Sequence, residues 1–363
     1  MSRFLADRYA TLKAYTPGEQ PTDKKYIKLN TNESPFPPSP KVIEAISAEQ
    51  VKDLRLYSDP ECRLLREKLA EQFGYDLENV FVSNGSDDIL NFSFMAFCDG
   101  DKCGVAFPEI SYGFYQVYAD LHGVNAKKIP LAPDFSVRAS DYFQAGRTVV
   151  IANPNAPTGI ALSKQEIEEI VKSNPNNVVL IDEAYVDFGA ESCVELVKTY
   201  ENLLVVRTYS KSYSLAGARL GFAIGSRELI EDLEKIKYST NPYNINRLTL
   251  LAGVAAIEEN DYYMGNCKVI EKNRAYLTEA LTEMGFSVLP SKANFVFAAS
   301  PAIDGEALYL KLKENGILVR HFQTESIRRF NRITIGTMDE MKALVKAIQG
   351  ILRDVQEDKE KTR

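Results

Sequence analysis

The sequence has few of the residues on which disulfide frameworks, metal sites and imidazole catalysis depend. Its five cysteines are scattered, odd in number and without a Cys-x-x-Cys pair, which argues against a disulfide framework and a zinc cluster. Only two histidines are present, and His122 precedes a glycine in the pattern expected at a helix C-terminus. With His321 the one remaining candidate, imidazole cannot easily supply a metal site or a Ser/His/Asp triad. We therefore expect no metal ion and a catalytic base other than histidine.

Excess positive charge and long apolar runs are also missing. The net charge of -7 leaves no positive field to hold a nucleic acid or an anionic membrane surface. No apolar run approaches the ~18 to 20 residues that a membrane span needs, and the first residues mix charge into every turn instead of forming a signal-peptide core. The glycine spacing does not fit a nicotinamide-binding Gly-x-Gly-x-x-Gly loop, which argues against a dehydrogenase. We expect a cytoplasmic protein without nucleic-acid or membrane partners.

The sequence does contain a regular alternation of strand and helix patterns. Its 363 residues suffice for about two domains, and 45% hydrophobic residues can supply a sizeable core. Several β-rich runs are continuously apolar, as expected for strands covered on both faces. This alternation predicts an α/β domain with a mainly parallel sheet, which binds ligands at the carboxyl ends of its strands. The runs are VFVSN, CGVAFP, TVVIANP, VVLIDEAY, LLVVRTYS and RLGFAIG.

Three regions are expected along the chain. The proline-rich segment at 34–40 suits neither a helix nor a central strand, so residues 1–40 are predicted to form an arm joined to a small domain. Residues 41–245 are predicted to form the large domain, and residues 246–363 a smaller α/β domain. The last ten or so residues, after about residue 354, have no apolar periodicity and are expected to be a solvated, fraying tail.

Two polar residues that follow apolar runs carry the main chemical signal. Asp182 ends such a run, where a buried carboxylate needs a cationic partner, and a protonated pyridine nitrogen would serve. An Asp at this place is also a favoured cap for a following helix. Lys211 follows another run, among small hydroxyl residues, so desolvation and a nearby cation would lower its pKa and give the free amine that attacks an aldehyde. The alternative for Lys211 is a surface lysine in a loop.

A candidate anion site accompanies these two residues. Arg219 lies eight residues after Lys211 and can grip a dianionic phosphate through its planar fork, aided by the hydroxyls of Thr208 and Ser210. In FVSNGSDDILNF a strand, a glycine and a helical pattern follow one another, so the helix would begin with free N–H groups that bind phosphate. Its opening residues are Gly85, Ser86 and Asp87. The adjacent acids leave open an ordinary charged first helical turn.

Taken together, these segments resemble the fold-type I aminotransferases, which use pyridoxal 5'-phosphate, and most closely the histidinol-phosphate aminotransferase family. The resemblance covers nearly the whole chain and implies a large domain on a mainly parallel sheet and a smaller α/β domain formed by the arm and the C-terminal part. An ordered set of motifs is far more specific than any one motif. The motifs are KLNTNESP, YSDPE, SNGSDD, NPNAPTG, DEAYVDF, TYSKSYSLAGARLGF and NRITIGT.

The resemblance assigns the cofactor contacts. Lys211 matches the residue that carries the cofactor as a Schiff base and later moves a proton, and Asp182 matches the partner of the pyridinium. Asn155 and Tyr185 match residues that hydrogen-bond the phenolate oxygen of the ring. Tyr112 matches the aromatic residue that stacks on the ring, although a tyrosine also packs readily in a helix core. The phosphate-binding positions are Gly85, Ser86, Asp87, Thr208, Ser210 and Arg219.

The resemblance also assigns residues to a dimer and to the substrates. Family members are homodimers, and Tyr57 matches the residue lent to the neighbouring subunit's cofactor phosphate. Arg332, at the expected start of a strand, matches the arginine that clamps the α-carboxylate of glutamate. Arg320 would help it to take the phosphate of histidinol phosphate, unless Arg320 is a surface ion-pairing residue. Tyr15 and Asn32 match residues of the arm that close over the substrate.

The implied reaction is a transamination of histidine biosynthesis between L-histidinol phosphate and 2-oxoglutarate, which gives imidazole acetol phosphate and glutamate. Closely similar motifs occur in aromatic-amino-acid aminotransferases and in threonine-phosphate decarboxylase. Because histidinol phosphate and threonine phosphate both require a phosphate clamp, the arginines do not separate them. A non-enzymatic ligand-sensing module is a further alternative, but the acidic chain shows no appended DNA-binding domain and carries a chemically competent residue at each cofactor position.

Overall fold

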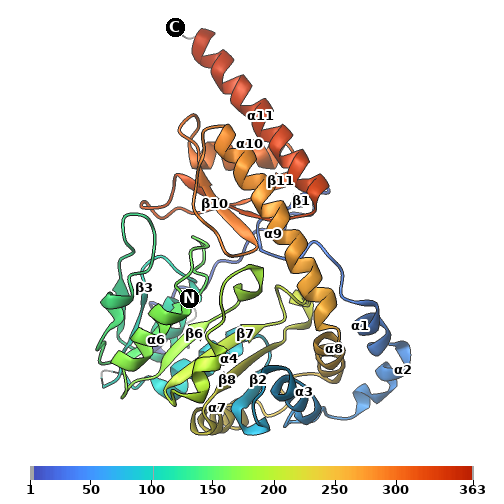
Figure 1. Ribbon diagram of the computed structural model, residues 1–363, viewed down its shortest axis with the longest axis vertical. Helices are drawn as coiled ribbons and strands as arrows, with labels where there is room; N and C mark the ends of the chain where they lie inside the picture. Colours follow the sequence, from blue (N-terminus) through green and yellow to red (C-terminus); the bar gives the residue numbers. More distant parts are fainter. Residues whose placement is uncertain (1–3, 101, 362–363) are drawn as a thin grey trace.

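The computed structural model describes residues 4–100 and 102–361, with a large unit built on a twisted sheet and a smaller unit beside it (Figure 1). Within these residues the seven-stranded sheet of the large unit has the order β2-β8-β7-β6-β5-β3-β4. β8 is antiparallel to both of its neighbours, and the other pairs are parallel. The strands are β2 Val80–Ser83, β3 Val105–Pro108, β4 Ala126–Ile129, β5 Thr148–Ala152, β6 Val179–Asp182, β7 Leu203–Thr208 and β8 Gly221–Gly225.

This sheet confirms the predicted α/β fold, and each of the six predicted runs contains one of its strands. Only β4 was not anticipated. It pairs with β3 alone and carries the exposed Lys127 and Lys128 at its centre. Charged residues of this kind are common on edge strands, because they discourage pairing with another chain. They also remove the apolar signal by which a strand is found in a sequence.

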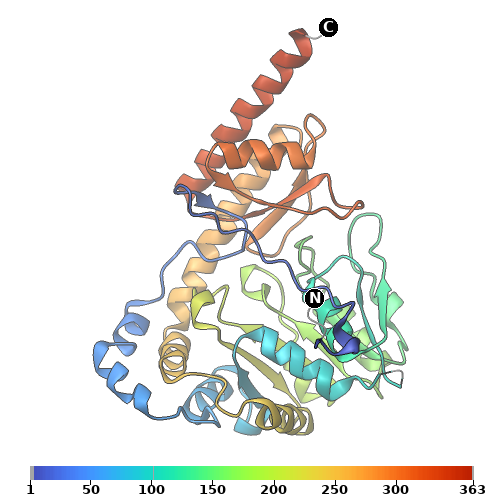
Figure 2. The same cartoon turned by 180° about the vertical axis from the view of Figure 1, so that it is seen from behind.

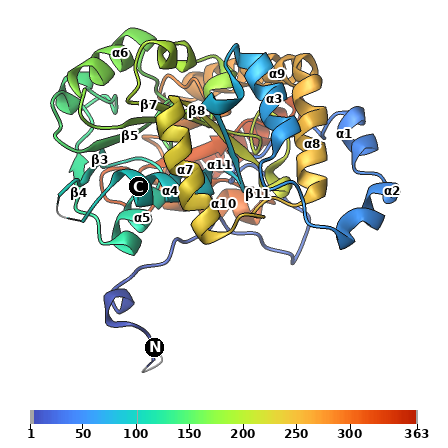
Figure 3. The ribbon, with the colours of Figure 1, turned by 90° about the horizontal axis from the view of Figure 1, so that it is seen from below.

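The central strands bury both faces, in two separate cores. Leu203 and Val205 of β7 belong to the core that includes residues of α3 and α6, whereas Leu204 between them belongs to the core that includes residues of α4, α5 and α7. This alternation follows from the two-residue period of a strand. Seen from below, helices cover the sheet on both sides (Figure 3). They are α3 Arg63–Phe73, α4 Ser86–Phe97, α5 Phe114–His122, α6 Lys164–Ser173 and α7 Arg227–Thr240.

The smaller unit combines the arm with the C-terminal part of the chain. Within the described residues, β12, β13, β10 and β9 form an antiparallel sheet in that order, and β1 of the arm pairs in parallel with β11 through Ile27 and Ile317. The arm therefore crosses from the small unit towards the large one, as the view from behind shows (Figure 2). The elements are β1 Ile27–Lys28, α9 Asn260–Glu283, β9 Ser287–Val288, β10 Phe295–Ala299, α10 Gly305–Glu314, β11 Ile317–Leu318, β12 Arg320–His321, β13 Phe330–Thr334 and α11 Met338–Lys361.

The remaining helices join the units or end at their edges. α8 packs against α1 and α3, and its buried residues, such as Ala256 and Ile257, belong to the core of the large sheet. The large core thus continues past residue 245, although the division into domains itself stays a prediction. These helices are α1 Pro40–Ala45, α2 Ala48–Val51 and α8 Arg247–Glu258, with short 3-10 helices η1 Asp7–Tyr9, η2 Lys52–Arg55, η3 Leu77–Asn79, η4 Ala139–Tyr142, η5 Val186–Phe188, η6 Val194–Lys198 and η7 Ala216–Ala218.

The expected fraying tail is instead helical. α11 continues to Lys361 and projects away from the small unit (Figure 1). The residues after 354 include strong helix formers, and Gln356 donates to Glu360 one turn later. The prediction of a fraying tail depended on the lack of apolar periodicity in these residues. This end of the helix is mostly exposed, so it needs no apolar face. In the described part of the chain, no helix is both long and apolar enough to cross a membrane.

Two glycine-to-alanine substitutions are expected to change stability in opposite directions. At Gly221 an added Cβ would lie 2.4 Å from Ser86 N and 2.6 Å from Gly85 C, backbone atoms that cannot move aside. We expect Gly221→Ala to lower the free energy of unfolding by about 1–3 kcal/mol, as overpacking does. At Gly350, within α11, nothing lies within 4 Å of an added Cβ, so Gly350→Ala should raise it by about 0.5–1 kcal/mol.

Urea denaturation of the two variants and of the unaltered chain measures both effects. A Gly221→Ala protein as stable as the unaltered one would show that the backbone around residue 85 is not packed as tightly as described.

Candidate active site

A cavity of about 270 Å³ lies at the carboxyl ends of β6 and β7. It brings together residues from separate parts of the sequence that were predicted to hold the cofactor. Their individual roles stay predictions, but most of the set shares one space. The predicted residues that line this inner cavity are Ser86, Asp87, Tyr112, Asp182, Tyr185, Thr208, Ser210, Lys211 and Arg219.

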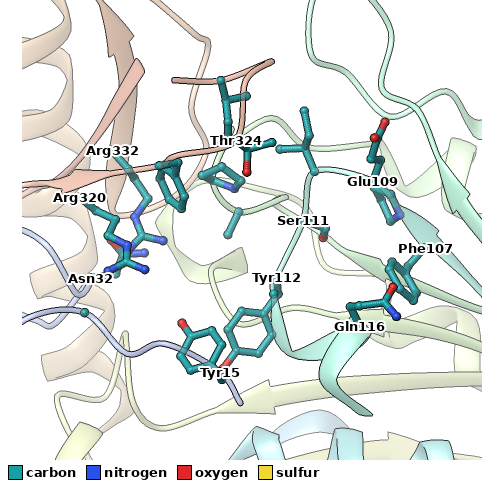
Figure 4. A pocket seen from close by; sticks show the side chains of 18 of the residues that line it. Tyr15, Asn32, Phe107, Glu109, Ser111, Tyr112, Gln116, Arg320, Thr324 and Arg332 are labelled. Carbon is teal, nitrogen blue, oxygen red and sulfur yellow. The ribbon is translucent and has the colours of Figure 1, made fainter. Parts of the chain in front are cut away.

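A second, outer cavity of about 450 Å³ shares Tyr112, Tyr185 and Lys211 with the inner one. It collects the four residues that were predicted to contact the substrate. In Figure 4, Asn32, Arg320 and Arg332 lie on one side of this cavity, and the rings of Tyr15 and Tyr112 lie beside each other below. The centroids of these two rings are 6.3 Å apart.

Asp182 is the last residue of β6, and only 4% of its surface is exposed. Its Oδ2 accepts a hydrogen bond from Tyr115 Oη at 2.8 Å, and its Oδ1 accepts one from Ala184 N at 3.2 Å. Burial raises the pKa of Asp182 to about 6, and these two hydrogen bonds oppose the rise. The alternative role as a helix cap does not apply, because the following 3-10 helix has Tyr185 at its N-cap. The carboxylate is thus free to meet a cation in the cavity.

Lys211 lines both cavities and is not a surface lysine. Its Nζ donates to the carbonyl of Thr31 at 3.3 Å and lies 5.7 Å from the centroid of the Tyr185 ring. The next residue, Ser212, donates to Asp187 at 2.6 Å, and Asp187 also forms an ion pair with the buried Arg207. Through Ser212, the ion pair of Asp187 and Arg207 anchors the loop that carries Lys211 to strand β7.

The predicted anion site forms where α4 begins. Arg219 Nη2 contacts Asp87 Oδ2 at 2.9 Å, and Tyr112 Oη donates to Asp87 Oδ1 at 2.8 Å. The charge of this acid is therefore offset by the arginine. Gly85 has φ +86, and a Cβ there would lie 2.8 Å from Arg219 Nη2, so both the turn and the approach of the arginine require glycine. Arg219 Nη1 also donates to Ser210 Oγ at 3.4 Å.

Arg332 and Arg320 are directly opposite each other on β13 and β12. Arg332 lies within its strand and not at its start, and its Nη2 donates to the carbonyl of Asn30 at 2.9 Å. Burial lowers its pKa, and among the described residues its buried Nε has no hydrogen-bond partner. Arg320 donates to the carbonyls of Thr16 and Pro17 in the arm, so it does not act as a surface ion-pairing residue there. An anion placed between the arginines would satisfy the orphaned donor.

Three predicted cofactor residues do not line either cavity, namely Gly85, which forms the turn before α4, Tyr57 and Asn155. Tyr57 is 80% exposed and stacks on Tyr243, with ring centroids 4.5 Å apart. Asn155 is buried in the cavity wall, where its Oδ1 accepts from Ser111 and its Nδ2 donates to the carbonyl of Ile110 at 2.9 Å. Its second amide proton points to Thr158 Oγ1 at 3.3 Å, a long contact.

Sequence reasoning missed the residues that support the site from behind. Tyr115, which donates to Asp182, lies in the first turn of α5, and its closeness in the sequence to Tyr112 is the one signal that could have indicated it. The pair formed by Asp187 and Arg207 had no such signal, because the two residues belong to different elements twenty positions apart.

Comparisons with known proteins agree with this arrangement. The model of the family "Aminotransferase class I and II" matches residues 24–348. The histidinol-phosphate aminotransferase of Brachyspira hyodysenteriae is 50% identical over 356 residues, which are 98% of this chain and 100% of that protein. The corresponding protein of Marinomonas sp. is 51% identical over 352 residues, covering 96% and 99% of the two chains.

Solved structures are similar over most of the chain as well. The histidinol-phosphate aminotransferase of Sinorhizobium meliloti, in complex with pyridoxal-5'-phosphate, has a TM-score of 0.84 at 25% identity, covering 92% of each chain. That of Clostridium acetobutylicum has a TM-score of 0.83 at 25% identity, covering 90% of this chain and 99% of the other. The chain therefore belongs to the class I and II aminotransferases and, within them, to the histidinol-phosphate aminotransferase family.

Proposed function

We propose that this protein is a cytoplasmic, pyridoxal-phosphate-dependent aminotransferase of histidine biosynthesis, which transfers an amino group between L-histidinol phosphate and 2-oxoglutarate. The observation that carries the proposal is the shared cavity of Asp182 and Lys211. These residues end and follow β6 and β7, which are neighbouring parallel strands. A single small aromatic ring can therefore meet the carboxylate at one end and the amine at the other.

The residues of the inner cavity fit pyridoxal phosphate. Asp182 accepts its hydrogen bonds from a phenol and a backbone amide, both uncharged, so the buried carboxylate still favours a cation such as a protonated pyridine nitrogen. The first turn of α4, Arg219 and nearby hydroxyls supply donors for a phosphate. When bound, the cofactor supplies an aldehyde that joins amines and a ring that withdraws electrons from the substrate carbon.

The protein's own residues then have distinct tasks. Lys211 Nζ would hold the cofactor through its aldehyde carbon and, once the substrate amine has replaced it there, the freed amine would move the proton at the substrate carbon that bears the amino group. Asp182 holds the proton on the ring nitrogen, because a buried carboxylate without that partner is unfavourable. Tyr185 and Tyr112 line both cavities, so Tyr185 Oη would donate to the ring oxygen and Tyr112 would orient the ring.

Both substrates are bound by the same pair of arginines. Arg332 and Arg320 form one face of the outer cavity, close to Lys211 and Tyr185. Their planar forks bind the phosphate of histidinol phosphate in one half-reaction and the carboxylate of glutamate in the other. The relatives of Brachyspira hyodysenteriae and Marinomonas sp. are named for histidinol phosphate, and this supports the choice of substrate.

Association of two copies would complete the cofactor site. The exposed apolar side chains include a group along α1, α2, η2 and the start of α3, beside an apolar cavity of about 210 Å³. Exposed apolar side chains gathered along neighbouring helices are typical of an interaction surface. We propose that it is the homodimer interface and that Tyr57, which lies outside its own cavity, reaches the partner's cofactor phosphate. The group consists of Ile43, Ile46, Val51, Leu54, Leu56, Tyr57 and Leu64.

A substrate comparison tests the proposed function. We expect the purified, cofactor-loaded protein to be yellow and to lose its visible band with histidinol phosphate, but not with threonine phosphate or phenylalanine. Lys211→Ala should lack the band of the lysine-bound cofactor, because Lys211 is the only lysine among the described residues that line the inner cavity. Lys128→Ala, a lysine at the rim of the outer cavity, is the matched control and should keep the band. Loss of the band with phenylalanine alone would identify an aromatic aminotransferase.

Arg332→Ala is expected to impair both half-reactions. Truncating one partner of a buried, charge-assisted contact costs about 2–5 kcal/mol, so kcat/KM should fall at least about 30-fold with glutamate and with histidinol phosphate alike. The exposed Arg329→Ala, three positions earlier, should leave both values near those of the unaltered enzyme. Unchanged kinetics with glutamate in Arg332→Ala would contradict the shared clamp.

Tyr57→Phe is expected to weaken cofactor retention by about tenfold, because it removes one hydrogen bond to a charged phosphate, worth roughly 1.5 kcal/mol. The cofactor dissociation constant measures the effect, and Tyr238→Phe, another partly exposed tyrosine, serves as the control. Mixed dimers of Tyr57→Phe and Lys211→Ala should contain one complete site each. A fully active monomer would refute the exchange of Tyr57 between subunits.

A further inference from the structure

Residues 30–32 of the arm touch three groups of the site. Arg332 Nη2 and Lys211 Nζ donate to the backbone carbonyls of the first two of these residues, at 2.9 and 3.3 Å. The third residue, Asn32, donates from its Nδ2 to Tyr185 Oη at 3.0 Å. The contact between Asn32 and Tyr185 has a fixed direction, because the amide nitrogen can only donate. Tyr185 Oη is therefore the acceptor.

The orientation of the Asn32 side chain is set by the small unit. Its backbone N–H donates to Thr334 Oγ1 at 3.0 Å, so that oxygen acts as an acceptor. The single hydroxyl proton of Thr334 then goes to Asn32 Oδ1, also at 3.0 Å. Asn294 Nδ2 holds the Asn32 carbonyl at 3.0 Å, and only 1% of Asn32 is exposed. With its oxygen held by Thr334, the amide must turn its nitrogen towards Tyr185.

A hydroxyl that accepts from Asn32 keeps its own proton for another acceptor. Tyr185 lines the inner cavity, so that proton is available to the ring oxygen of the cofactor. We infer that Asn32 is a positioning residue, which acts through Tyr185 by directing the tyrosine's hydroxyl proton into the cofactor cavity. The inference rests on the proposed function, since it concerns how this chain prepares its site for that ring.

Several charged or titratable groups face Tyr185 and remain in place when Asn32 is changed. Lys211 lies over the ring of Tyr185, and Arg332 interacts with the same phenol electrostatically. Tyr15 and Tyr115 are the neighbouring phenols. Both cations are present in every variant, so differences between variants report on the hydrogen bond between Asn32 and Tyr185.

Asn32→Asp reverses the hydrogen bond with almost no change in shape. Aspartate tolerates the left-handed backbone of this position, φ +57, and its carboxylate accepts the Tyr185 proton. The ring oxygen then loses its donor, and the proton that it shares with the nitrogen bound at the aldehyde carbon is held more tightly. The pH midpoint of the visible absorbance of the loaded enzyme should rise by about one unit. An unchanged midpoint in the folded variant overturns the inference.

Changes at Thr334 separate orientation from charge. Thr334→Val removes the hydroxyl that orients the amide without adding charge, and it should shift the midpoint upwards, by less than Asn32→Asp. Thr334→Ser keeps the hydroxyl and should leave the midpoint unchanged. In a Tyr185→Phe background, Thr334→Val should cause no further shift, because no hydroxyl remains to be oriented. An equal shift in both backgrounds would show that the residues do not act through Tyr185.

A measurement without cofactor keeps this inference separate from the proposed function. In the cofactor-free chain labelled with ¹³Cζ-tyrosine, the signal of Tyr185 is assigned by its loss in Tyr185→Phe. Asn32→Asp should raise the pKa of the Tyr185 phenol, because the new carboxylate accepts its proton. The same phenol pKa in both proteins overturns the inference, whereas failure of the unaltered chain to bind cofactor would overturn only the proposed function.

Discussion

The buried carboxylate of Asp182 is the constraint on which the rest of the site depends. A carboxylate that is only 4% exposed at the end of a central strand is costly unless a cation meets it. Burial brings its pKa to about 6, and the hydrogen bonds from Tyr115 and Ala184 oppose that rise, so the group stays largely ionised at neutral pH. Asp182 lines the inner cavity, so a cation that enters this cavity can meet its carboxylate. The protein thus holds a buried charge ready for a positively charged ring.

The topology of the sheet explains why Lys211 and the residues of the predicted anion site lie in the same cavity as Asp182. Parallel strands end at the same edge, so a carboxylate that ends β6 and a lysine that follows β7 are neighbours without any sequence proximity. The anion site uses the antiparallel part of the same sheet, where Gly221 on β8 lies against the backbone of Gly85 and Ser86. The close approach of these backbones is possible only because two of the three residues have no side chain.

The arm connects the small unit and the large unit at the site. It is tied to the small unit through β1 and Thr334, and to the large unit through Lys211 and Tyr185. A few residues of irregular chain therefore connect Arg332, a predicted anion-binding residue, with Lys211 and Tyr185, which are predicted to contact the cofactor. Loops held by rigid elements are a usual place for such functions. Residues 30–32 are held in place by hydrogen bonds with side chains of both units.

Local signals in the sequence determined the fold class and the sheet edge at which the cavity lies, and they predicted Asp182 and Lys211 as residues of the site. Apolar runs identified the strands of the large sheet except β4, whose central lysines hide it, and Asp182 and Lys211 stand directly after two of those runs. Only the tertiary structure decided which residues meet. The opposition of Arg320 and Arg332 depends on strand register, and Asn32 contacts Tyr185 from 153 positions away. Such contacts leave no periodic pattern, because they arise from the packing of whole elements and not from the conformation of neighbouring residues.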